Sequence, residues 1–176
     1  MRLTPQGLWA FGRLIPCTLG RAGIRAAGDK REGDAATPAA LLHVTACYYR
    51  PDRLAAPGPW AVPLRPGDLW CDAPDHPAYN RLARAPLAAS HEDMRRADPL
   101  YDIVLVTDWN TLPVRPGRGS AIFLHQWRRP GHPTAGCLAM ARENIAWLAA
   151  RAAPGTPLLI LPLAGRAFVA RAHHGV

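Results

Sequence analysis

The sequence pairs one nucleophile with one base at a spacing that suits covalent catalysis. Cys137 follows Gly136 at a break between an apolar strand and a helix, and His125 ends the apolar run 121–124, twelve positions earlier. A strand followed by a loop can return the imidazole to the thiol, and a glycine lets the backbone approach a ligand closely. The pattern therefore predicts a cysteine nucleophile served by a histidine base. Taken alone, His125 fits a buried structural histidine better, and it is the pairing with Gly136-Cys137 that favours the catalytic interpretation.

A cysteine of this kind needs a local device to make it reactive. A free thiol has a pKa of about 8.5 and is mostly protonated near neutrality, so a nearby imidazolium or helix N-terminus must lower its pKa. We expect His125 to supply the first device and the helix that follows residue 139 to supply the second. An activated thiol of this type would react with alkylating agents below pH 7.

The sequence offers few residues for a serine nucleophile, a metal site or a redox site. The only two serines, Ser90 and Ser120, sit at an expected helix start and a strand start, which leaves little for a serine hydrolase. Cys17, Cys47 and Cys71 are widely spaced and form no Cys-x-x-Cys motif, so neither a zinc knuckle nor a dithiol redox site is indicated. We expect them to be small buried side chains, and we expect no metal and no organic cofactor.

The elements that must position the pair are mostly strands. Residues 39–49, 102–108 and 120–127 are rich in β-branched and aromatic residues, and turn residues between the last two predict adjacent strands. Two further strands are expected at 157–161 and 166–172. Residues 140–152 place Ile145, Leu148, Ala149 and Ala152 on one helical face. A second, shorter helix is expected from Ser90, stopped by Asp98 and Pro99.

The remaining segments are less regular in pattern. Residues 1–20 show no clear period, and the proline-rich stretch 51–86 is expected to be long and irregular. Glycines alternate with charges over residues 21–38, which predicts a surface loop. Within that loop we expect a solvated charged group formed by Lys30, Arg31, Glu32 and Asp34.

Length and composition limit the classes of protein to which this chain can belong. A chain of 176 residues that is 49% hydrophobic and 19% charged is expected to form one folded domain over residues 1–176. Its 19 prolines and 15 glycines favour many short elements over long helices. The net charge of +8 comes from scattered arginines without a basic block, so nucleic-acid binding is not expected. No apolar run approaches the roughly 20 residues of a membrane span, and we expect no signal peptide.

The residues around the pair resemble a known family. The string 120–128, SAIFLHQWR, with 133–140, PTAGCLAM, is similar to the active-site signature of YkuD/ErfK-type L,D-transpeptidase catalytic domains, in a branch that reads Thr-Ala-Gly-Cys. Further pieces that agree in order are LGRAGI at 19–24, KREGD at 30–34, TP at 37–38, WCD at 70–72, YNR at 79–81, MRRAD at 94–98, YD at 101–102 and DWN at 108–110. The resemblance is strongest over residues 17–162.

The resemblance implies a fold and a reaction. The fold would be mainly β, a YkuD-like sandwich with two or three short helices, one of them directly after the catalytic cysteine. Cys137 would attack the carbonyl between the third residue of a peptidoglycan stem peptide and its terminal D-alanine, releasing D-alanine and leaving a thioester. An amine of a second stem would resolve it as a 3→3 cross-link. His125 would act as base and acid, with its other nitrogen on a backbone carbonyl, and amides of Gly136 and Cys137 would hold the oxyanion.

We also expect several residues near the pair to contact the substrate. We expect Arg128 to bind a stem-peptide carboxylate, since a guanidinium matches that group bidentately, and Trp127, Thr134, Asn110 and Tyr79 to line the cleft. The common motif carries histidine and arginine where this chain has Ala135 and Ala139, so those side chains contribute nothing here.

Two other functions remain open at this point. One is an L,D-carboxypeptidase, in which water resolves the thioester, and the other is a non-catalytic module that binds the cell wall. The family implies a location in the periplasm or cell envelope, although without a recognised signal peptide a cytoplasmic location is also open.

Overall fold

Short strands make up most of the chain, as the sequence predicts. The computed structural model describes residues 1–162, in which one α-helix and one 3-10 turn accompany fourteen strands. The strands are β1 (Arg2–Thr4), β2 (Gly7–Ala10), β3 (Arg13–Ile15), β4 (Cys17–Thr18), β5 (Ile24–Ala26), β6 (Thr37–Tyr49), β7 (Val62–Pro63), β8 (Asp68–Cys71), β9 (Arg81–Arg84), β10 (His91–Asp93), β11 (Ile103–Thr107), β12 (Phe123–Gln126), β13 (Leu138–Met140) and β14 (Pro157–Ile160). The 3-10 turn η1 spans Pro99–Tyr101, and the helix α1 spans Arg142–Ala149.

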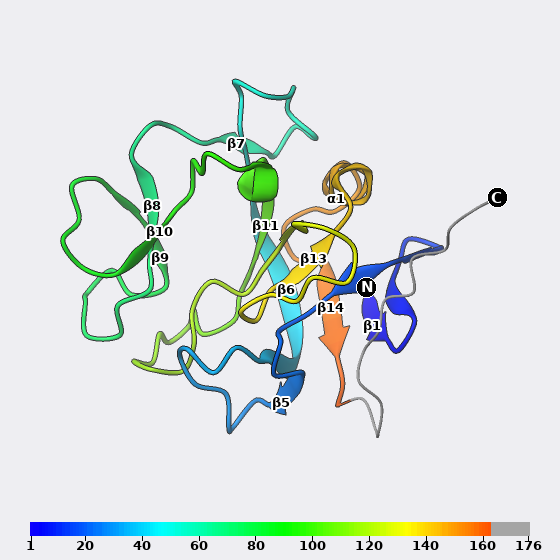
Figure 1. The fold of residues 1–176 in the computed structure, drawn as a ribbon, viewed down its shortest axis with the longest axis horizontal. Coiled ribbons are helices and arrows are strands. Elements are labelled where there is room, and N and C mark those ends of the chain that lie inside the picture. The colour runs from blue at the N-terminus through cyan, green and yellow to red at the C-terminus, as the bar shows by residue number, and fades with distance from the viewer. Residues whose placement is uncertain (163–176) are drawn as a thin grey trace.

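Two mixed or antiparallel sheets organise these strands. In the larger sheet the order is β3-β2-β1-β14-β6-β11-β12-β13-β4, with β5 and β7 pairing β6 at its ends. The smaller sheet has the order β10-β8-β9 and lies apart from the β1–β14 side of the molecule (Figure 1). The long strand β6 lies in the middle of the large sheet, between β14 and β11. It therefore joins the side formed by β1, β2, β3 and β14 to the side formed by β11 and β12. The fold is mainly β.

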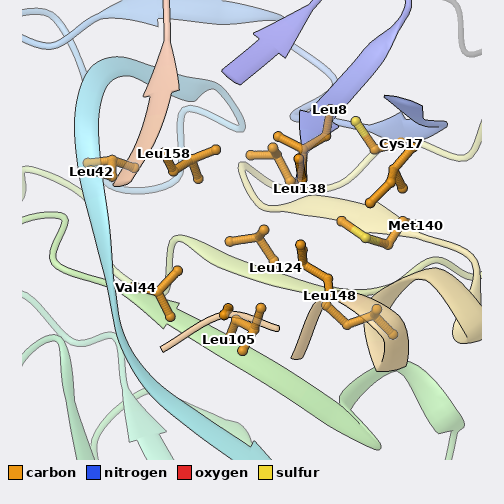
Figure 2. Close-up of a cluster of buried hydrophobic side chains, with 14 of the residues drawn as sticks. Leu8, Cys17, Leu42, Val44, Leu105, Leu124, Leu138, Met140, Leu148 and Leu158 are labelled. Carbon is orange, nitrogen blue, oxygen red and sulfur yellow. The ribbon is translucent and has the colours of Figure 1, made fainter. Parts of the chain in front are cut away.

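The large sheet buries both of its faces at β11 and β12. Successive side chains of a strand point to opposite faces. Ile103 and Leu105 accordingly enter one core, whereas Val104 and Val106 enter another. The first core includes Leu124, Leu138, Met140 and, from α1, Leu148 (Figure 2). The second is smaller and lies between the two sheets.

The second core positions the residues of interest. Phe123 of β12 packs edge-on against Trp70 of β8, with ring centroids 4.9 Å apart, and Cys137 belongs to the same cluster. Tyr101 of η1 contacts both Phe123 and His125 with its ring. The small sheet and η1 therefore cover the face of the large sheet on which Cys137 and His125 lie.

Several predicted elements are confirmed. The strands expected at 39–49, 102–108 and 157–161 are β6, β11 and β14, and the strand expected at 120–127 is the shorter β12, which pairs with β11. Helix α1 buries Ile145, Leu148 and Ala149, as its pattern predicts. The strand expected at 166–172 lies outside the described residues.

Other expectations were wrong. The helix expected from Ser90 is the strand β10, because Glu92 and its neighbours pair with β8 and the helical turn starts only at Pro99, where Asp98 caps it. Residues 21–38 are not merely a surface loop, since β5 lies within them. Lys30 is only 2% exposed and donates to Asp34 and to the Arg31 carbonyl, so it is no solvated charge.

The segments without a clear pattern are also structured. Residues 1–20 form the four strands β1 to β4, and the proline-rich stretch 51–86 contains β7, β8 and β9. Both rely on pairing between distant segments: β1, for example, pairs with β14 near the end of the described chain. None of the described helices has the length and apolarity that crossing a membrane requires.

Candidate active site

Cys137 and His125 lie on the same face of two adjacent parallel strands, with His125 in β12 and Cys137 immediately before β13. In the β12–β13 pairing, His125 is opposite Ala139, so Cys137, two residues before Ala139, lies on the face that His125 occupies. The amide of Phe123 donates to Cys137 Sγ at 3.4 Å, which fixes the sulfur beside β12. Both side chains line one cavity of about 350 Å³. The structure thus brings the predicted pair to a common opening.

The thiol itself is held by the backbone. Cys137 Sγ donates to the Ala121 carbonyl at 3.0 Å. Cys137 is 8% exposed, whereas Cys17, Cys47 and Cys71 are fully buried. Of the four free cysteines, Cys137 is therefore the one that keeps some exposure, and it lines the cavity that His125 also lines.

A glycine is required beside the cysteine. Gly136 has φ +144°, and a Cβ there would lie 2.9 Å from the Ala36 carbonyl oxygen. Its own carbonyl accepts from Thr37 Oγ1 at 2.8 Å, at the start of β6. Because any side chain would push this loop away from Ala36, Gly136 allows the backbone ahead of the nucleophile to sit directly on the N-terminal half of the chain.

Thr134 closes the loop that carries the thiol. Its hydroxyl accepts from the Gly136 amide at 3.1 Å and donates to the Cys137 carbonyl at 2.7 Å. Its backbone bridges to Gly20, with the Thr134 amide donating to the Leu19 carbonyl. The Gly136 amide is therefore already bonded, which makes the Cys137 amide the better candidate for an oxyanion donor of the two named from the sequence.

The protonation state of His125 follows from its partner. Nδ1 lies 2.7 Å from the Gln126 carbonyl oxygen, which can only accept, so Nδ1 carries the proton. Burial lowers the pKa of His125 to about 4, although the Gln126 hydrogen bond acts in the opposite direction. The imidazole is neutral at pH 7 and Nε2 is left as a proton acceptor. A backbone carbonyl orients this histidine, as the resemblance implies.

The thiol is not ionised in advance. Burial raises the pKa of Cys137 to about 12, and the negative charge of Glu92 adds to the rise. The expected lowering of the Cys137 pKa was wrong, since His125 carries no positive charge. The strand β13 also stands between Cys137 and the N-terminus of α1, so the helix offers the thiol no direct assistance. The resting pair is a neutral thiol and a neutral imidazole.

Three of the five predicted substrate contacts line the cavity with the pair. Trp127, Arg128 and Thr134 are among its lining residues. Arg128 is exposed, and its guanidinium makes no hydrogen bond or ion pair with residues 1–162. It is therefore available to bind an anionic group of a ligand.

Tyr79 and Asn110 lie away from this cavity and support it from behind. Tyr79 Oη accepts from the Gly119 amide at 3.1 Å and donates to Glu32. The side chain of Asn110 bonds to the backbone of Arg115 and Gly119 and so closes a loop. Both residues fix the segment that leads to Ala121, the partner of the thiol.

The cavity residues that the sequence reasoning did not assign to the site include Glu92, Arg96 and Tyr101. Tyr101 Oη donates to Glu92 Oε2, and its ring lies edge-on to His125 with centroids 5.2 Å apart. The Arg96 guanidinium lies over the Tyr101 ring, 5.3 Å from its centroid, and is paired with Asp98. The Arg96 and Tyr101 segments belong to the family-like pieces at 94–98 and 101–102, which was the one signal available. Residues 1–162 contain no cluster of three or more side chains suited to hold a metal ion.

Comparison with protein families decides the assignment. The model of YkuD, the L,D-transpeptidase catalytic domain, matches residues 7–160. The chain belongs to the YkuD family.

Membership in the YkuD family implies a cysteine enzyme that modifies peptidoglycan, and members of this family generally act in the cell envelope. The match covers the segments that form both sheets and α1. Searches of curated proteins and of solved structures gave no match to the chain.

Proposed function

We propose that this YkuD-family chain is an L,D-transpeptidase that forms 3→3 cross-links between peptidoglycan stem peptides. The observation that carries the proposal is the placement of Cys137 and His125 on one cavity, with His125 neutral and its Nδ1 fixed by Gln126. In this role the Cys137 sulfur attacks the carbonyl before the terminal D-alanine. Its proton passes to His125 Nε2.

The neutral pair suits a mechanism in which proton transfer accompanies attack. A thiol with a raised pKa is a weak nucleophile on its own, so the imidazole takes the proton as the C–S bond forms. His125 then returns the proton to the departing D-alanine amine, and a thioester remains on Cys137. The thiol gives up its bond to the Ala121 carbonyl in this step.

The charge of the cavity suits the donor peptide. Arg128 and Arg96 line it, together with Arg21, which gives it three guanidinium groups against the single carboxylate of Glu92. A D-alanine carboxylate at the end of a stem peptide is the kind of group that an unpaired guanidinium binds. Arg128 is our candidate for that contact, because Arg96 is already paired with Asp98.

The test uses defined stem peptides and mass spectrometry. Incubation of a tetrapeptide stem with the protein should release D-alanine, add the tripeptide acyl mass to Cys137, and yield a cross-linked dimer. Cys137→Ala should give none of the three. A tripeptide product without dimer would instead assign L,D-carboxypeptidase activity, and ligand binding without any product would leave a wall-binding module.

A further inference from the structure

A second cavity adjoins the cysteine on the side away from His125. It has a volume of about 240 Å³ and shares Arg21, Glu92, Ala135 and Cys137 with the first. His125, Arg96 and Arg128 line only the first cavity, and Glu32, Lys30 and Asp72 line only the second. The sulfur therefore stands at the junction of two chambers, and Glu92 reaches both.

The two chambers differ in charge. The second contains the carboxylates of Glu32, Asp72 and Glu92. Of its two cations, Lys30 is committed to Asp34 at 2.8 Å, which leaves Arg21 as the counter-charge. The first chamber is instead rich in guanidinium groups. A ligand with a carboxylate in the first chamber and an ammonium in the second would match this division.

Glu92 lines both chambers and is held through only one of its two carboxylate oxygens. Its Oε2 accepts from Tyr101 Oη, whereas Oε1 has no hydrogen-bond donor among residues 1–162. Burial raises the pKa of the Glu92 carboxyl, and the nearby Asp72 and Glu32 add to the rise while Arg96 opposes it. Asp72 has one buried carboxylate oxygen, Oδ1, that also lacks a donor in the described structure. Unsatisfied acceptors of this kind favour a ligand that brings N–H donors.

We propose that Glu92 is the catalytic residue that binds the acceptor ammonium in the second chamber and takes its proton. This inference rests on the proposed transpeptidase function. The ammonium gives one proton to the Glu92 carboxylate and becomes an amine. The amine nitrogen then attacks the thioester carbon, forming the amide bond while the C–S bond breaks. The sulfur leaves as a thiolate and regains a thiol by taking the second proton of the attacking nitrogen through His125, and Glu92 later releases its proton to solvent.

In this scheme the transfer step needs a second base besides His125, because two protons must leave the acceptor nitrogen. His125 lines the first chamber, where it serves the donor peptide, and at pH 7 its neutral form can relay a single proton. An ammonium that arrives in the second chamber must lose a proton before it becomes nucleophilic. Glu92 is the carboxylate that borders both chambers and the sulfur.

The experiment separates acylation from transfer with the variant Glu92→Gln, whose amide oxygen can still accept from Tyr101. With a tetrapeptide donor, the variant should acylate Cys137 and release D-alanine at least as fast as the wild type, because loss of the Glu92 charge removes one cause of the raised Cys137 pKa. Transfer to a second stem peptide that carries a free alkyl amine should fall on the order of a hundredfold, with tripeptide from hydrolysis as the replacement product. Hydroxylamine is neutral at pH 7, so its transfer should proceed at the wild-type rate.

Two further variants accompany Glu92→Gln, one as a control and one as a substitute. Asp93→Asn changes an exposed carboxylate next to Glu92 on β10 and should transfer to both amines like the wild type. If Glu92→Gln does not fold, Tyr101→Phe removes the hydroxyl that fixes the carboxylate and should show the same selective loss with the alkyl amine.

Equal losses with hydroxylamine and the alkyl amine, or an unchanged ratio of dimer to tripeptide, would overturn the role of Glu92 and leave the proposed function standing. Absence of acylation in the wild type would refute the proposed function itself, and the role of Glu92 with it.

Discussion

The Cys137 thiol donates a hydrogen bond to the Ala121 carbonyl at 3.0 Å, so the nucleophile rests in its protonated form against the backbone. Asn80 holds Ala121 in place by accepting from its amide at 3.0 Å, while the same side chain donates to the Trp109 and Asn110 carbonyls. The sulfur is therefore aimed by a chain of backbone contacts and not by a charged neighbour.

Alkylation should report this protonated state. With a Cys137 pKa raised to about 12, the folded protein should hold on the order of a thousandfold less thiolate at pH 7 than an unstructured cysteine. Iodoacetamide labelling of Cys137, followed by peptide mass spectrometry, should be slow at pH 7 and still rising at pH 9. Fast labelling with an apparent pKa below 7 would contradict the neutral pair.

Replacing His125 should remove the base without removing the thiol. His125→Gln is expected to slow acylation of Cys137 on the order of a hundredfold or more, because the variant lacks the imidazole nitrogen that takes the thiol proton. The readout is the rate of thioester formation by mass spectrometry. His43→Gln, which alters a solvent-accessible pair with Asp108, serves as the control, and equal rates in all three proteins would disprove the role of His125.

The buried histidine also makes stability depend on pH. His125 has a pKa of about 4 when folded, below its ordinary value of 6.5, so the unfolded chain binds a proton first as the pH falls. Its contribution to the free energy of unfolding is intact above pH 6.5 and declines by about 3 kcal/mol as the pH falls to 4. His125→Gln should flatten this part of the stability profile, measured by urea unfolding at each pH. An identical slope in both proteins would argue against a buried neutral imidazole.

Gly136→Ala should disturb the loop before the nucleophile. The added Cβ meets the Ala36 carbonyl at 2.9 Å in a backbone conformation that alanine rarely adopts, which is expected to cost about 1–3 kcal/mol. Thermal unfolding should show the loss, and thioester formation should fall with it. Gly28→Ala, where an added Cβ meets nothing within 4 Å, should behave as the wild type does. Matching melting temperatures for the two variants would show that Gly136 is not required.

Arg128 should affect binding more than chemistry. Loss of a charged hydrogen bond to the terminal carboxylate in Arg128→Met is expected to raise KM for the tetrapeptide roughly tenfold with kcat little changed. The neighbouring Arg129→Met removes the same charge from a residue that does not line the cavity and should leave KM unchanged. If both variants shift KM equally, the effect is one of overall charge.

The sequence predicted the central strands, and it singled out Cys137 and His125 as a candidate pair, because both depend on local signals. The β-branched run at 103–107 and the apolar stretch before His125 favour strands locally, and their pairing in the large sheet agrees with that preference. The segment at Ser90 shows the opposite case: it carries a helix-start pattern, yet pairing with β8 makes it a strand. Pairing between distant segments outweighs a weak local propensity.

The environment of the pair could not be predicted for the same reason. The pKa directions of Cys137 and His125 arise from burial by the small sheet and η1, which a single motif does not encode. Tyr79 and Asn110 support the site, but only their hydrogen bonds show that they face the backbone of residues 115–119 and not the cavity.

The most direct measurement is intact-protein mass spectrometry of the wild type and Cys137→Ala after incubation with a tetrapeptide stem. A peptidoglycan transpeptidase that works through Cys137 predicts a tripeptide acyl adduct on the wild type, localised to Cys137, and no adduct or D-alanine release with the variant. Undiminished D-alanine release by Cys137→Ala would contradict it.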